Sequence, residues 1–84
     1  MSVTPAQVKM ARAALDWTVR DLAKATGLHR NTINNIEVGR HSGDAETLQK
    51  IERVLYAAGV EFIPENGGGE GVRLRKLQRL KRPK

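Results

Sequence analysis

The sequence contains no cysteine and no hydrophobic run of the length that a membrane helix requires. Without cysteine, disulfide bonds and thiolate metal sites are excluded. A membrane-spanning helix needs about 18 or more consecutive apolar residues, and no run approaches that length. The N-terminus carries Thr4-Pro5 and an amphipathic run, where a signal peptide would have a basic start and a long apolar stretch. We therefore expect a cytoplasmic protein without membrane contact.

Acidic residues are absent from Val72 to the C-terminus, where seven basic residues occur. The net charge of the whole chain is +6, yet residues 1–71 hold eight basic and nine acidic residues. The basicity therefore belongs to the tail. We expect residues 76–84 to be flexible, and the alternative is a short basic helix that displays Leu74, Leu77 and Leu80. The tail should supply either a salt-sensitive attraction to phosphate or a solubilising end.

The sequence also lacks the patterns that indicate catalysis or metal binding. His29 and His41 are isolated, and no cysteine or carboxylate accompanies them at ligand spacing. Gly67-Gly68-Gly69 lacks the Lys-Ser/Thr that follows in a phosphate-binding loop, which favours a flexible turn. No arrangement of a nucleophile and a base is evident. We expect no enzyme activity, no metal and no cofactor.

What the first 59 residues do contain is the pattern of a small helical domain. Thr4, Pro5 and Gln7 form a capping box with proline at the first helical position, and this helix ends at Asp16-Trp17. Further helices are expected over about residues 19–25 and 30–37 and from Asp44 to Gly59. Trp17 is interpreted as a core residue between the first two helices.

After Gly59 the hydrophobic period changes from helical to alternating. Residues 60–63 and 72–75 read as two strands around a glycine-rich turn over 64–71. Two strands alone are marginal in water, so residues 60–75 should either pack on the last helix or pair with a second subunit. The sequence leaves these alternatives level. The residues predicted to dimerise are Val60, Phe62, Ile63 and Val72.

Residues 18–40 combine two short helices with a tight turn. Ala23 is a small residue where two helices can approach, and Gly27 suits a backbone turn with positive φ. The second of these helices should bury an apolar stripe and expose polar side chains able to donate and accept hydrogen bonds. These exposed side chains are His29, Arg30, Asn31, Asn34 and Asn35.

The residue pattern resembles the XRE family, the lambda-repressor and Cro-like helix-turn-helix proteins. The residues that carry the resemblance are Arg12, Leu22-Ala23, Gly27, Thr32-Ile33 and Glu37-x-Gly39. The resemblance implies a mainly α, lambda-repressor-like bundle of four to five helices, here followed by a C-terminal β-hairpin. It also implies a structural ion pair between Arg12 and Glu37. One departure is Val19, where family members usually have a glutamine that contacts a phosphate.

In such proteins the third helix lies in the major groove of DNA, and this implies a set of contacts. The base-contacting candidates are His29, Arg30, Asn31, Asn34 and Asn35. Arg30 is suited to guanine and both Asn31 and Asn35 to adenine, whereas Asn34 contacts either a base or a phosphate according to the docking angle. The phosphate-contacting candidates are Thr18, Arg20, Thr32, Arg40, His41 and Ser42. For Thr32, contact with a thymine methyl group is the alternative to contact with a phosphate.

These expectations converge on a sequence-specific, nucleoid-associated transcriptional regulator, expected to be a repressor. One helix-turn-helix reads too few bases for specificity in a genome, so we expect a homodimer on double-stranded DNA. A second hypothesis is an antitoxin whose hairpin and tail bind a toxin. A third is an architectural DNA binder without sequence preference, which the near-neutral body disfavours because such binding depends mainly on charge.

Overall fold

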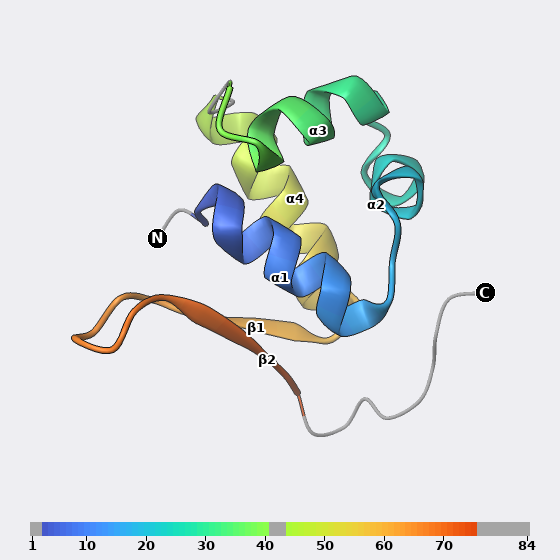
Figure 1. The fold of residues 1–84 in the computed structure, drawn as a ribbon. Helices are drawn as coiled ribbons and strands as arrows, with labels where there is room; N and C mark the ends of the chain where they lie inside the picture. The colour runs from blue at the N-terminus through green and yellow to red at the C-terminus, as the bar shows by residue number, and fades with distance from the viewer. Residues whose placement is uncertain (1–2, 41–43, 76–84) are drawn as a thin grey trace.

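The computed structural model describes residues 3–40 and 44–75, which form four helices and a two-stranded antiparallel sheet. The mainly helical fold with a C-terminal hairpin is as predicted (Figure 1). The bounds of the elements are α1 Pro5–Leu15, α2 Val19–Thr26, α3 Arg30–Glu37, α4 Ala45–Ala57, β1 Val60–Ile63 and β2 Gly71–Leu74.

Local hydrogen bonds explain where the helices begin. Thr4 and Thr18 each form a complete capping box, with Gln7 and Asp21 respectively. At α4 the carboxylate of Asp44 accepts a hydrogen bond from the backbone N–H of Thr47 at 2.9 Å. Each of these acceptors satisfies a backbone donor that the first turn of a helix leaves without a partner.

The end of α2 differs by one residue from the prediction. Thr26, expected in the turn, is the last residue of the helix and is buried. Its hydroxyl donates to the carbonyl of Leu22 at 2.8 Å and accepts from the backbone N–H of Leu28 at 3.2 Å. Threonine can therefore stay inside the helix because both hydrogen-bonding functions of its hydroxyl are used locally.

The core lies between the four helices and the inner face of the hairpin. The buried apolar residues come from every helix, from β1 and from Val3 before α1, and Trp17 packs against them as predicted. These residues are Val3, Val8, Ala11, Leu22, Ile33, Ile36, Ile51, Leu55 and Val60. A chain of 84 residues can thus form one continuous core, to which both the helix-turn-helix segment and the hairpin are attached.

The hairpin is held to α1 by the buried side chain of Gln7. Its Nε2 donates to the carbonyls of both Ile63 and Gly71 at 3.0 Å, and these two residues are paired across the sheet. The same side chain accepts from the backbone N–H of Thr4 at 3.1 Å. Because Gly71 pairs with Ile63, β2 spans Gly71–Leu74, one residue earlier than the predicted 72–75.

The other end of the hairpin is fastened to α4 through Arg75. Its backbone N–H donates to the carbonyl of Gly59 at 2.8 Å, and its guanidinium lies 4.1 Å from the ring centroid of Tyr56. A cation is attracted to the face of an aromatic ring, so the contact with Tyr56 strengthens the attachment made by the backbone hydrogen bond to Gly59. Residues 76–84, the predicted tail, lie outside the described residues.

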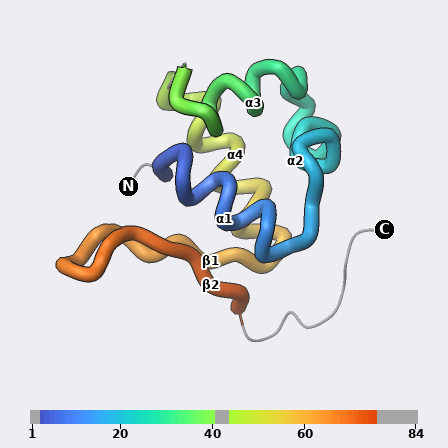
Figure 2. Tube along the Cα trace, viewed as in Figure 1, coloured from blue at the N-terminus to red at the C-terminus, as the bar shows by residue number. Residues whose placement is uncertain are grey.

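In the structure the hairpin packs against helices of its own chain, which is one of the two predicted alternatives. Contacts join α4 to β1 and α1 to β2, and the hairpin runs along α1 and α4, away from α3 (Figure 2). Val60 has 0% exposure. Its side chain is therefore part of the chain's own core and offers no surface to a second subunit.

Candidate nucleic-acid interface

The turn between α2 and α3 depends on the backbone of Gly27. Its φ is +78°, and its N–H donates to the carbonyl of Ala23 at 2.8 Å, which closes the last turn of α2. A Cβ at this position would meet nothing within 4 Å. The requirement for glycine is therefore conformational, because side chains rarely adopt this φ.

The inner face of α3 fixes the helix to the body. Ile33 and Ile36 are completely buried, and Glu37 is 7% exposed. Positions three and four apart lie on the same face of a helix, so these three residues form one contact surface. The residues of this contact surface leave the opposite side of the helix facing away from the body.

The outer face of α3 carries Arg30, Asn31 and Asn34, all exposed. Among the described residues, none of these side chains makes a hydrogen bond or an ion pair. Thr32 and Asn35 are half-buried and lie at the margin of this face. The structure thus brings the predicted base-contacting side chains of α3 onto one surface, with Asn35 less accessible than the others.

A bidentate ion pair joins α1 to the end of α3. The Nε and Nη2 of Arg12 each donate to a carboxylate oxygen of Glu37 at 2.8 Å, and Nη1 donates to the carbonyl of Trp17 at 3.0 Å. The hydrogen bonds to Glu37, helped by its negative charge, raise the pKa of Arg12 above its ordinary value. The pair that the resemblance implies is therefore present, and it holds the orientation of α3 through two parallel hydrogen bonds.

His29 has a role in the structure that sequence reasoning missed. It is the N-cap of α3, and its Nδ1 accepts a hydrogen bond from the backbone N–H of Asn31 at 3.0 Å. Its position just before a helix was the available signal, although imidazole is not among the preferred capping groups. The side chain remains exposed.

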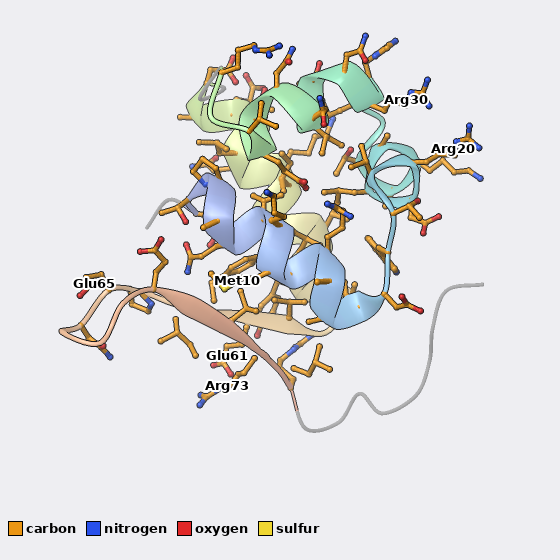
Figure 3. All side chains as sticks on the ribbon, viewed as in Figure 1. Met10, Arg20, Arg30, Glu61, Glu65 and Arg73 are labelled. Carbon is orange, nitrogen blue, oxygen red and sulfur yellow. The ribbon has the colours of Figure 1, made fainter. Side chains whose placement is uncertain are left out.

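The beginning of α2 lies near the same surface. Thr18 and Arg20 are exposed, and Thr18 uses its hydroxyl oxygen as the cap of the helix. Arg20 and Arg30 extend away from the body on the same side of the molecule (Figure 3). Val19 is half-buried against the core, and its side chain has no group that can donate a hydrogen bond.

The residues after α3 are described only in part. Arg40 is exposed, and its backbone N–H donates to the carbonyl of Asn35 at 3.0 Å. Gly39 before it has a φ of +79°, which turns the chain away from the helix axis. His41 and Ser42, both predicted to contact phosphate, lie outside the described residues.

The described residues include no group of three or more potential metal-binding side chains. Within the same residues, no helix is long and apolar enough to span a membrane. The chemistry that the surface of α2 and α3 offers is hydrogen bonding by guanidinium, amide, imidazole and hydroxyl groups. These groups match the donors and acceptors at base edges and the oxygens of phosphate.

Comparison with known proteins agrees with this geometry. A helix-turn-helix family model matches residues 8–55, which run from α1 to α4. No curated protein matches the chain. The match covers more than half of the sequence and includes the turn at Gly27, the outer face of α3 and both members of the ion pair. The chain therefore belongs to the XRE family of helix-turn-helix proteins, whose domain binds DNA.

Proposed function

We propose that this protein is a sequence-specific transcriptional regulator that places α3 in the major groove and acts as a repressor. The observation that supports this most is the division of α3 into two faces. Its inner face is fixed by Ile33, Ile36 and the Arg12–Glu37 pair, whereas its outer polar groups have no partner in the described part of the chain. Polar side chains held in place without partners are suited to reading base edges.

The proposed contacts follow from position on the two helices. Arg30, Asn31 and Asn34 contact bases together with His29, and Asn35 contributes at the edge of the groove. Thr18, Arg20, Thr32 and Arg40 contact phosphates, with His41 and Ser42 continuing this set. Phosphate contacts set the orientation of the protein, and base contacts supply the sequence preference.

We also propose that the protein binds DNA as a homodimer formed through the hairpin. The described sheet has only two strands, so each strand has one edge without a neighbouring strand. Phe62 and Val72 pack against the core, whereas Ile63 is half-buried without belonging to that cluster. Successive side chains point to opposite faces, which places Ile63 with Glu61 on the outer face. Ile63 is therefore the most suitable of the predicted residues for contact with a second subunit.

Replacing Ile63 by lysine should shift the full-length protein from dimer to monomer at micromolar concentration. The new charge would have to be buried in the interface, while the core beneath the hairpin would be unchanged. Sedimentation equilibrium measures the mass, and circular dichroism checks that the variant is folded. The control is Val38→Lys, at a residue that is 55% exposed and outside the hairpin. A wild-type protein that is monomeric at these concentrations would contradict the dimer.

The experiment that tests the proposed function is selection of bound sites from random DNA by the full-length protein. A sequence-specific dimer should enrich two related half-sites arranged with two-fold symmetry and a fixed spacing. Enrichment of a single half-site would support sequence recognition without the dimer. Equal retention of all sequences would contradict the proposal and favour architectural binding.

A toxin-binding role is the second candidate function, and the two strand edges of the hairpin are the observation that favours it. An exposed edge can accept a strand from another protein as readily as from a second copy. Co-purification of a second small protein with the full-length chain would support an antitoxin. A pure homodimer recovered from the native host would favour regulation without a protein partner.

A further inference from the structure

We infer that His29 takes part in DNA recognition only as a hydrogen-bond donor, through its Nε2–H, and therefore contacts acceptor atoms of the DNA. This inference rests on the proposed function. The residue type alone does not decide whether His29 donates or accepts a hydrogen bond in this contact. A neutral histidine can present either a donor or an acceptor, according to which ring nitrogen carries the proton.

The capping hydrogen bond decides which nitrogen carries the proton. Nδ1 of His29 lies 3.0 Å from the backbone nitrogen of Asn31. A backbone N–H can only donate, so Nδ1 must present its lone pair to it. In the neutral ring the single proton is then on Nε2. The helix cap thus converts an ambiguous side chain into one with a defined polarity at its outer atom.

The position of the ring makes this polarity relevant to the interface. His29 is exposed and directly precedes Arg30 and Asn31 on the outer face of α3. Its Nε2 has no hydrogen-bond partner among residues 3–40 and 44–75. In a helix-turn-helix complex the N-terminal part of the recognition helix, here α3, is the part that contacts the bases. The proton on Nε2 is therefore available to the DNA.

A donor at this point selects among the groups that DNA presents. The acceptors of the major groove are N7 and O6 of guanine, N7 of adenine and O4 of thymine, and phosphate oxygens are acceptors as well. The amino groups of cytosine and adenine are donors, and a donor facing them would leave both groups without a partner. His29 should therefore tolerate an acceptor base or a phosphate and disfavour the cytosine amino group.

Two substitutions separate the outer donor from the cap. His29→Ser keeps an oxygen acceptor for the Asn31 N–H and removes the outer N–H, whereas His29→Ala removes both. We expect both variants to bind the selected DNA site about fivefold more weakly, the effect of one hydrogen bond. Only His29→Ala should also melt at a lower temperature. If His29→Ser binds that site as tightly as the wild type, His29 is only a helix cap and the inference is wrong.

A repeat of the random-DNA selection with His29→Ser identifies the acceptor. Loss of preference at one base pair, where the wild type disfavours cytosine opposite the ring, indicates a base acceptor. An equal loss of affinity for all sequences indicates a phosphate oxygen. A preference of the wild type for an amino group at the position that His29→Ser relaxes would overturn the inference. If the wild type selects no sequence, the proposed function fails, and the inference fails with it.

Discussion

Replacement of Arg12 by alanine should lower the free energy of unfolding by about 3 to 5 kcal/mol, the usual cost of removing one partner of a buried ion pair. The Glu37 side chain is 3% exposed, and both of its carboxylate oxygens accept hydrogen bonds from Arg12. Without the guanidinium this carboxylate would be buried with neither a counter-charge nor those donors. Urea denaturation followed by circular dichroism measures the change.

The chain contains a matched control in its exposed ion pair. Arg73 and Glu61 approach to 2.9 Å, close to the 2.8 Å of the buried pair, but their side chains are 65% and 43% exposed. Because water solvates and screens both groups, Arg73→Ala should change stability little. The double replacement Arg12→Met with Glu37→Leu should recover much of the loss, since no buried charge remains. Similar losses for Arg12→Ala and Arg73→Ala would show that burial of the pair is not what matters.

Replacement of Arg30 by alanine should weaken binding to the selected DNA site by about 1 to 3 kcal/mol and relax the preference at one base pair. Arg30 is the first residue of α3, is exposed, and extends from the same side of the molecule as Arg20 (Figure 3). Its planar fork can donate to two acceptors of guanine at once. Fluorescence anisotropy with the selected site and with single-base variants measures both effects.

Two further variants separate base reading from simple attraction by charge. Arg53→Ala removes an equal charge at an exposed position of α4 and should leave the base preference unchanged. Arg30→Lys keeps the charge but loses the fork, so a base contact predicts weaker selectivity in this variant. If Arg30→Lys keeps full affinity and selectivity, Arg30 contacts phosphate and another residue of α3 reads the base.

The helices could be predicted well because their signals are local. The capping boxes of α1 and α2 join residues that are three positions apart in the sequence, as does the cap of α4. The positive φ at Gly27 is likewise a property of one residue type in one place. The predicted end of α2 was one residue too early, because the hydroxyl of Thr26 forms a hydrogen bond with the carbonyl of Leu22 inside the helix.

The surface of α3 could be predicted less completely. Helical periodicity separates its inner from its outer face, but the partial burial of Thr32 and Asn35 depends on how neighbouring elements pack beside the helix. The capping role of His29 is a contact over only two positions, yet imidazole is rarely used in this way and gave no clear signal. The exposed outer face of α3 could thus be predicted, but the hydrogen bond that occupies Nδ1 of His29 could not.

The sequence by itself determined the order of the helices, their caps, the turn at Gly27 and the polar outer face of α3, because each depends on residues within a few positions of one another. Only the tertiary structure decided where the hairpin packs. Gln7 binds carbonyls 56 and 64 positions away, and Val60 joins the buried core that the helices form. Hydrogen bonds and burial at such separations arise only when the chain has folded, so no local pattern indicates them.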